Sequence, residues 1–263
     1  MNLGSCTALV TGGAIRIGRA ICEALADRGC GVIVHYQRSA GEAESLVHLL
    51  RDRGGRAFRM QGALESERGA AGLVDEAWSA AGGFNILVNN ASVFNKDALP
   101  DVTEEKLIGD FRVNLLAPMV LTRAFAARVR RAGAGEDGGP IAGKIVNLLD
   151  RRIAGLDTQC IPYVLSKKAL AEFTRLAALE LAPSITVNGV APGAILPPST
   201  RRPAGQGSSG TISDLAGPAP LRHACTPADV ARAVVFLLEE DAITGQVLYV
   251  DAGQHLLGPA ARE

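Results

Sequence analysis

The feature that most constrains the fold is an alternation of short apolar runs with longer segments of helical hydrophobic spacing. Apolar runs of this length, rich in β-branched residues and ended by turn-forming residues, predict buried strands. The predicted strands lie within residues 6–13, 31–36, 56–63, 84–92, 143–149, 185–193 and 245–250, and the predicted helices within 17–29, 40–55, 66–83, 110–131, 163–181 and 226–240. Strands that alternate with helices in this way predict a doubly wound α/β fold, in which helices cover both faces of a parallel sheet.

No change of composition divides the chain, so we expect a single domain over residues 1–263. The stretch from about 196 to 220 is unusual, because Pro, Gly and Ser dominate it. Its composition is compatible with a linker, but a predicted helix and a predicted strand follow it. We therefore interpret it as a flexible loop over a substrate site.

The composition argues against several classes of function. Lys plus Arg and Asp plus Glu both number 27, so no net charge favours nucleic acid or an anionic membrane. The five scattered cysteines have no metal-ligand spacing, which predicts reduced, packed thiols and no metal site. Neither a membrane-spanning run nor the pattern of a secretion signal is found, so we expect a cytoplasmic protein.

A glycine-rich turn follows the first predicted strand. Gly12 and Gly13 end the strand, and Gly18 opens the next helix. Glycines at such a turn let the backbone approach a pyrophosphate, which the free N–H groups of a helix N-terminus attract. The spacing differs from the common dinucleotide motif, and a plain tight turn is the alternative. Its place between the first strand and the first helix favours a nucleotide site.

The residues after the second predicted strand indicate which nucleotide is bound. Folds that select NAD place an acidic side chain there to hold the ribose hydroxyls, and this chain has none. Arg38 and Ser39 follow instead, and we expect Arg16 of the glycine-rich turn to reach the same point. Arg38 alone is compatible with a solvated loop charge, but two guanidiniums and a hydroxyl suit a 2′-phosphate. The sequence therefore predicts NADPH.

Polar residues follow three of the later predicted strands. In a doubly wound sheet, ligands bind beyond the carboxyl ends of the strands. Asn90 and Ser92 follow one strand, Asp150 follows another, and Pro192 and Gly193 end a third. We therefore expect these residues to meet at one rim of the sheet.

Tyr163 and Lys167 stand four residues apart and so share one face of a predicted helix. An ammonium close to a phenol lowers the pKa of the phenol from about 10, which makes it a proton donor or acceptor near neutral pH. The spacing can arise by chance, so its meaning depends on the other motifs.

Those motifs occur in a familiar order. TGGAIRIG, NNAS, Asn114, YVLSK and APG together resemble the short-chain dehydrogenase/reductase family over nearly the whole chain. The resemblance implies a Rossmann-type sheet, a nicotinamide cofactor and a homotetramer that pairs helices 110–131 and 163–181. It also implies that Tyr163 is the general acid/base, that Lys167 holds the nicotinamide ribose and tunes Tyr163, and that Asn114 anchors a water of the proton relay.

Three departures from the family pattern resemble one subgroup, the pteridine reductases, which include bacterial dihydromonapterin and dihydrofolate reductases. Asp150 replaces the usual serine, Arg16 replaces a loop glycine, and NNAS replaces NNAG. The stretch from His35 to Ala43 and the residue Phe94 also fit this subgroup. Reduction of a pterin C=N bond needs a proton at a ring nitrogen, and a carboxyl beside Tyr163 is able to join such a relay. Phe94 offers a face for a flat pteridine, although a core aromatic is the alternative.

The resemblance also implies the binding residues. Those for the cofactor are Gly12, Arg16, Ile17, Gly18, His35, Tyr36, Arg38, Ser39, Leu64, Asn90, Ala91, Ser92, Tyr163, Lys167, Pro192, Gly193 and Ile195. Those for the substrate are Ser92, Phe94, Asp150 and Tyr163. Ala63 stands where the family carries an aspartate that contacts adenine, so we expect backbone and packing near Leu64 to hold the adenine.

The predicted activity is thus the NADPH-dependent reduction of a pteridine of the dihydropterin or dihydrofolate type. A reductase of small ketones or 3-oxoacyl thioesters, in which Asp150 merely replaces serine, is the first alternative. A non-catalytic nucleotide sensor is the second. The presence of Tyr163, Lys167 and Asn114 argues against a sensor, because a sensor has no need of proton-transfer groups.

Overall fold

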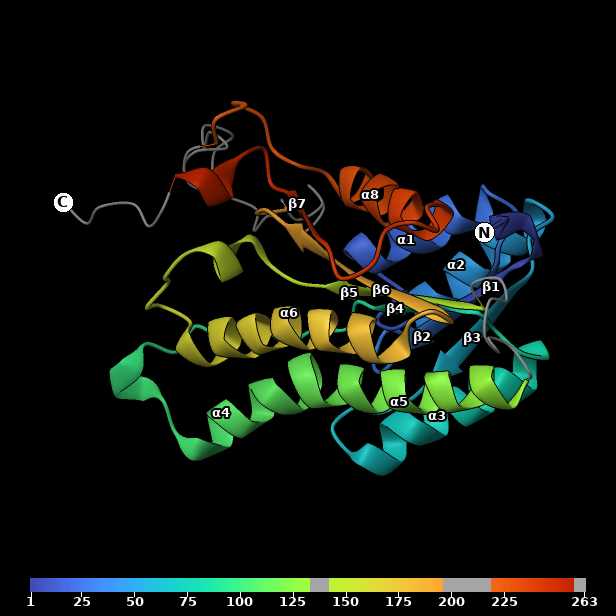
Figure 1. Cartoon of the computed structure of the whole chain (residues 1–263), viewed down its shortest axis with the longest axis horizontal. Helices are drawn as coiled ribbons and strands as arrows, with labels where there is room; N and C mark the ends of the chain where they lie inside the picture. The colour runs from blue at the N-terminus through green and yellow to red at the C-terminus, as the bar shows by residue number, and fades with distance from the viewer. Residues whose placement is uncertain (133–141, 196–218, 258–263) are drawn as a thin grey trace.

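A computed structural model describes residues 1–132, 142–195 and 219–257 of the chain. Within these residues, seven parallel strands form one sheet in the order β3-β2-β1-β4-β5-β6-β7 (Figure 1). The strands are β1 (Thr7–Val10), β2 (Gly31–Tyr36), β3 (Ala57–Gln61), β4 (Ile86–Asn89), β5 (Gly143–Leu148), β6 (Ile185–Pro192) and β7 (Val247–Val250). The predicted doubly wound fold of the Rossmann type is therefore confirmed.

Helices cover both faces of the sheet (Figure 1). One face carries α1 (Arg16–Ala26), α2 (Ala40–Asp52) and α8 (Pro227–Glu239), and the other carries α3 (Glu67–Ala81), α4 (Glu104–Phe111), α5 (Ala117–Arg131) and α6 (Ile161–Leu181). Successive strand residues point to opposite faces, so Val10 packs in the core beneath α1 and Leu9 in the core beneath α3 and α5. Burial on both faces explains why the strands are continuously apolar.

The strand order reverses at β1, which lies between β2 and β4. At such a switch point the loops after the two central strands separate, and the opening between them is where ligands bind in this class of fold. The glycine-rich turn follows β1, and the NNAS motif follows β4. Both sequence motifs thus lie at the same end of the sheet.

The helix predicted over 110–131 differs most from the structure. The helical segment begins six residues earlier with α4, where the Thr103 hydroxyl accepts a hydrogen bond from the Lys106 N–H. It then passes through a short π-helical turn, η3 (Arg112–Leu116), into α5. Leu107, Ile108 and Phe111 have the apolar spacing of a helix, so the predicted boundary was set too late; in the folded chain only Asp110 of α4 is buried.

Three smaller features concern the start of α8, the cysteines and the lengths of the helices. Thr226 and Asp229 form a capping box at the start of α8, with Pro227 in the first turn. The cysteines are Cys6, Cys22, Cys30, Cys160 and Cys225, and all five are buried free thiols. In the part of the chain that the structure describes, no helix combines the length and apolar character needed to cross a membrane.

Two expectations concern the whole chain. The predicted flexible loop over about 196–220 lies almost wholly outside the described residues, which resume at Ala219. The assignment of residues 1–263 to one domain stays a prediction.

Candidate active site

The turn between β1 and α1 is built for close backbone approach. Gly12 has a φ of 61°, in the left-handed region that favours glycine. A Cβ on Gly18 would collide with the carbonyl oxygen of Gly12, so only glycine allows the helix to lie this close to the turn. Ile15, the N-cap of α1, gives no side-chain cap, which leaves the N–H groups of the first turn available. These features fit a pyrophosphate.

Asn90 holds this turn against the end of β4. Its Nδ2 donates to the carbonyl oxygens of Thr11 at 2.8 Å and Gly12 at 3.1 Å. In return, the Thr11 hydroxyl accepts hydrogen bonds from the backbone N–H groups of Asn90 and Ala91 at 2.9 and 3.0 Å. The start of the glycine-rich turn is thus tied to the end of β4, and Thr11, the first residue of the TGGAIRIG motif, is a member of this site that was not among the predicted binding residues.

The side chains of His35 and Tyr36 are buried, and the part of both residues in cofactor binding stays a prediction. The backbone N–H of Gly12 donates to Nδ1 of His35 at 3.1 Å, so Nε2 carries the proton and donates to the Gly62 carbonyl at 3.2 Å. Burial lowers the pKa of His35 to about 4. The neutral imidazole therefore joins the turn to the end of β3 and supports it from behind.

The residues predicted to hold a 2′-phosphate are at the surface. Arg16 and Arg38 are exposed, and Ser39 is the N-cap of α2 without spending its hydroxyl on a capping bond. Arg16 is the first residue of α1 and has a φ of 54°, a strained conformation for a side chain other than glycine. Leu64, by contrast, is buried against the α3 side of the sheet. The side chains of Arg16, Arg38 and Ser39 thus keep donors available for an anion beside the turn.

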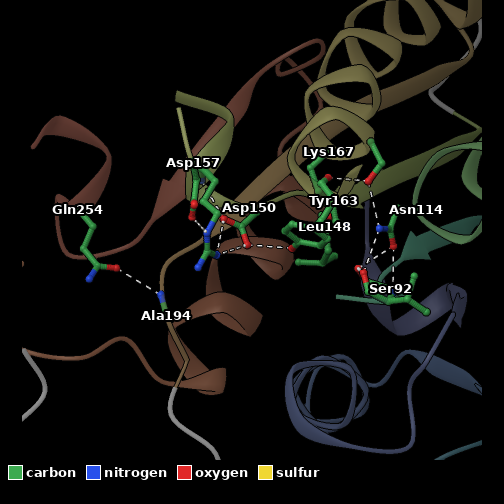
Figure 2. A network of polar contacts seen from close by, with 12 residues as sticks. Ser92, Asn114, Leu148, Asp150, Asp157, Tyr163, Lys167, Ala194 and Gln254 are labelled. Carbon is green, nitrogen blue, oxygen red and sulfur yellow. Dashed lines mark hydrogen bonds and ion pairs between the residues drawn. The ribbon is translucent and has the colours of Figure 1, made fainter. Parts of the chain in front are cut away.

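Asn114 lies in the η3 turn and is completely buried. Its Oδ1 accepts from the Ser92 hydroxyl at 2.9 Å and from the Val93 N–H at 3.0 Å (Figure 2). Its Nδ2 donates to the Val93 carbonyl at 3.0 Å and to the Ser166 hydroxyl at 3.1 Å. All four hydrogen-bonding positions of the side chain are filled, so the predicted contact with a relay water would have to come from its backbone.

The centre of the site is a contact between α6 and the end of β5. The hydroxyl of Tyr163 donates to Oδ2 of Asp150 at 2.9 Å, as Figure 2 shows. Phe94 meets the ring of Tyr163 edge to face, with 4.7 Å between the ring centroids. Phe94 is 46% exposed, so it is not the core aromatic that the sequence left as an alternative. Tyr163 therefore contacts both Asp150 and Phe94.

The prediction that Lys167 lowers the pKa of Tyr163 is wrong for this arrangement. Burial, followed by the charge of Asp150, raises the pKa of Tyr163 well above its usual value. Lys167 Nζ donates to the Leu148 carbonyl at 2.8 Å and lies 5.9 Å from the centroid of the Tyr163 ring. Burial lowers the pKa of Lys167 itself to about 8. The phenol is therefore held in its protonated form at neutral pH.

Arg152 belongs to this site, although none of the sequence motifs points to it. Its Nη1 lies 3.2 Å from Oδ2 of Asp150, and its Nε donates to Asp157 at 2.8 Å. The guanidinium carbon is 5.3 Å from the centroid of the Phe94 ring. An arginine four residues beyond a strand is typical of a solvated charge, and only the short helix η4 (Arg151–Ala154) turns it back toward Asp150.

The turn after β6 closes the rim of the site. Gly193 follows Pro192, and a Cβ there would lie 2.8 Å from Cα of Asp251, so glycine permits the close packing against the end of β7. The backbone N–H of Ala194 donates to the Gln254 side chain at 3.3 Å (Figure 2). Ile195 is half-buried and packs against the core beneath α1 and α8.

The fold and the site together define a dinucleotide-fold oxidoreductase. A family model described as enoyl-(acyl carrier protein) reductase matches residues 13–255. The chain belongs to the short-chain dehydrogenase/reductase family, as the motifs predicted.

Solved structures and curated sequences resemble the chain in different ways. A FolM alternative dihydrofolate reductase 1 from Brucella canis, complexed with NADP, is 36% identical with a TM-score of 0.84, and 100% of both chains is covered. An uncharacterized oxidoreductase of Methylorubrum extorquens is 34% identical over 94% of this chain and 96% of its own. A 3-oxoacyl-[acyl-carrier-protein] reductase, FabG, of Staphylococcus epidermidis is 29% identical over 95% of this chain and 99% of its own.

Proposed function

We propose that this protein is an NADPH-dependent reductase of a pteridine, either a dihydropterin or a dihydrofolate. The observation that carries the proposal is the hydrogen bond from the Tyr163 hydroxyl to Asp150. A carboxylate at this position differs from the serine of the general family pattern and suits a reaction that ends with a proton on nitrogen. The similarity to the Brucella canis dihydrofolate reductase supports the same reading.

The cofactor proposal rests on the turn after β1 and the start of α2. The N–H groups of the first turn of α1 would hold the pyrophosphate, and Arg16, Arg38 and Ser39 would hold the 2′-phosphate. Lys167, buried below the site, would hold the nicotinamide ribose. NADPH, when bound, supplies the hydride of the reduction.

The chain's own residues supply the proton. Tyr163 is protonated at neutral pH, because burial and Asp150 raise the pKa of its hydroxyl. The proton lies in the hydrogen bond between Tyr163 and Asp150, so the pair delivers it toward the substrate nitrogen as the neighbouring ring carbon accepts the hydride. Phe94, exposed beside Tyr163, offers a face against which a flat ring stacks.

Reduction of a 3-oxoacyl thioester is the second candidate. Its support is the similarity to the Staphylococcus epidermidis reductase and to a putative ketoacyl reductase of granaticin biosynthesis from Streptomyces violaceoruber, which is 33% identical over 95% of this chain. In that reaction Asp150 would only orient a carbonyl oxygen.

One experiment separates the two candidates. Initial rates of NADPH oxidation are measured side by side with dihydrobiopterin, dihydromonapterin, dihydrofolate and an acetoacetyl thioester. We expect turnover of at least one pterin or folate with a kcat/KM well above that for the thioester. Turnover of the thioester alone would overturn the pteridine proposal and promote the carbonyl reductase.

We also propose a homotetramer. Large apolar side chains are exposed on α6 and near the start of α5, namely Leu165, Leu176, Leu179, Leu116 and Met119. Exposed apolar side chains gathered on two helices favour contact with another subunit. A monomeric mass by light scattering at micromolar concentration would contradict this.

A further inference from the structure

Arg152 lies between two carboxylates at the centre of the site. Its Nη1 is 3.3 and 3.2 Å from Oδ1 and Oδ2 of Asp150, and its backbone N–H donates to Oδ1 at 2.8 Å. On the other side, Nε donates to Oδ2 of Asp157 at 2.8 Å. Figure 2 shows the two carboxylates close together at the end of the site. One guanidinium therefore bridges the candidate proton-relay acid to a second acid.

The bridge is partly shielded from water. The side chains of Arg152, Asp150 and Asp157 are 25%, 15% and 31% exposed, in contrast to most other ion pairs of the described residues. Burial acts to lower the pKa of Arg152, but the charges of Asp150 and Asp157 outweigh it, so the pKa is raised. The guanidinium thus stays charged wherever the enzyme works.

The contacts leave Asp150 little freedom. Oδ1 accepts from the backbone and Nη1 of Arg152, while Oδ2 accepts from Nη1 and from the Tyr163 hydroxyl. A carboxylate held at both oxygens cannot turn away from Tyr163 without breaking charge-assisted hydrogen bonds. The same guanidinium lies over the ring of Phe94, which it restrains by a cation–π contact.

We propose that Arg152 is a positioning residue of the reductase. It fixes the Asp150 carboxylate so that Oδ2 faces the Tyr163 hydroxyl, Asp157 anchors its guanidinium, and its planar face orders Phe94 on the substrate side. The inference rests on the proposed function, since it concerns the same proton-transfer site. A purely structural ion pair would stabilise the η4 segment without affecting the reaction.

The test compares Arg152→Ala, Arg152→Lys and Asp157→Asn with Arg175→Ala, which removes an arginine from the exposed Arg175–Glu172 pair. The readouts are kcat and KM for the pterin turned over best, the pH profile of kcat, the NADPH dissociation constant and Tm. Misplacing a catalytic group by about 1 Å lowers rates by roughly a hundredfold. We expect Arg152→Ala to lower kcat by about 10–100-fold, with little change in NADPH binding or Tm.

The variants should form a graded series. Arg152→Lys keeps the positive charge but cannot hydrogen-bond to Asp150 and Asp157 at once, so we expect partial activity. Asp157→Asn should give a smaller loss in kcat than Arg152→Ala. Guanidinium added to the solution should restore part of the activity of Arg152→Ala. It should restore none to Arg175→Ala, whose activity should equal that of the wild type.

The pH profile gives an independent readout. The ionisable groups whose charges act on Tyr163 or Arg152 are Asp150, Asp157 and Cys160, and Lys167 faces Tyr163 from the next turn of α6. Arg152 lowers the pKa of Tyr163, so its removal should move the alkaline limb of kcat to higher pH.

Two outcomes would overturn the proposal. One is an Arg152→Ala variant with wild-type kcat and an unmoved alkaline limb. The other is a loss of activity that merely follows a fall in Tm or in NADPH affinity. If the wild type reduces only the acetoacetyl thioester, the pteridine proposal fails, and the same variants measured with that thioester still decide the role of Arg152.

Discussion

The hydroxyl of Tyr163 donates to Oδ2 of Asp150 across 2.9 Å, and the two residues stand 13 apart in the sequence. The spacing alone does not create the contact. It arises because β5 ends just before Asp150, and α6 returns so that its first turn lies over the end of the sheet. In this arrangement, the carboxylate and the burial of the phenol together keep the phenol protonated.

Asp150→Ser separates the two candidate activities. If Asp150 belongs to the proton relay, the serine variant should keep its NADPH affinity but lose pterin turnover by at least about a hundredfold. Its alkaline limb should also move to lower pH, because Asp150 raises the pKa of Tyr163 and turnover needs the protonated phenol. Steady-state rates across pH measure both effects. A serine variant that reduces dihydrobiopterin at the wild-type rate would exclude a role for Asp150 in the proton relay.

Arg38→Ala tests the choice of cofactor. Losing one charge-assisted contact to phosphate weakens binding by about 1.5–3 kcal/mol, roughly tenfold or more. NADPH binding should fall by this amount, and NADH binding should change little, because NADH has no 2′-phosphate. Fluorescence titration of both cofactors measures the ratio, and Arg53→Ala, an exposed arginine after α2, is the control. Equal losses for the two cofactors would refute the assignment.

Arg16→Gly should stabilise the protein and weaken cofactor binding. Arg16 has a φ of 54°, a left-handed conformation that is strained for arginine but not for glycine. Glycine also makes the unfolded chain more flexible, which offsets part of the gain, so we expect a net stabilisation of about 0.5–1 kcal/mol. Arg222 has a φ of 55° on an exposed turn, so Arg222→Gly should give a similar gain in stability without affecting NADPH. Urea denaturation and cofactor titration measure the two effects. Tighter NADPH binding by Arg16→Gly would exclude a phosphate contact.

His35 should make the protein sensitive to acid. Burial lowers its pKa to about 4, below the usual 6.5, so the folded state disfavours the imidazolium. The stability present above pH 6.5 is lost as pH falls toward 4, by up to about 3 kcal/mol. His35→Asn, which keeps an acceptor for the Gly12 N–H, should flatten this decline; His48→Asn, at an exposed position on α2, should not. Denaturation series at pH 7, 5.5 and 4.5 measure the slopes, and identical slopes for both variants would contradict the prediction.

Lys167 should oppose folding at neutral pH. Burial lowers the pKa of Lys167 to about 8 from 10.5. The buried ammonium therefore lowers the free energy of unfolding by its full amount below pH 8, and this destabilisation disappears as pH rises to 10.5, where the lysine is neutral in the unfolded chain as well. Lys167→Met should raise the free energy of unfolding by about 1–2 kcal/mol at pH 7, after the lost bond to the Leu148 carbonyl is subtracted. The gain should shrink at pH 9.5, and activity should be lost. Lys168→Met is the matched control, and a gain independent of pH would count against a buried ammonium.

The amino-acid sequence by itself determined the layers of this protein and the end of the sheet where ligands bind. Continuous apolar strands are possible only where helices cover both faces, which is why the alternation predicted the doubly wound sheet. A tight turn requires glycine at positions such as Gly18, so the turn can be predicted from the sequence. The pairing of Tyr163 with Asp150 was implied by the family resemblance, and the contact between the two side chains agrees with it.

Only the tertiary structure decided how the charges behave. The predicted effect of Lys167 on Tyr163 failed because the depth of burial and the direction of the ammonium toward the Leu148 carbonyl depend on all the layers at once. The hydrogen bonds of Arg152 to Asp150 depend on where η4 turns the backbone. Hydrophobic spacing is a local property of the chain, whereas desolvation and hydrogen-bond partners are set by segments far apart in sequence.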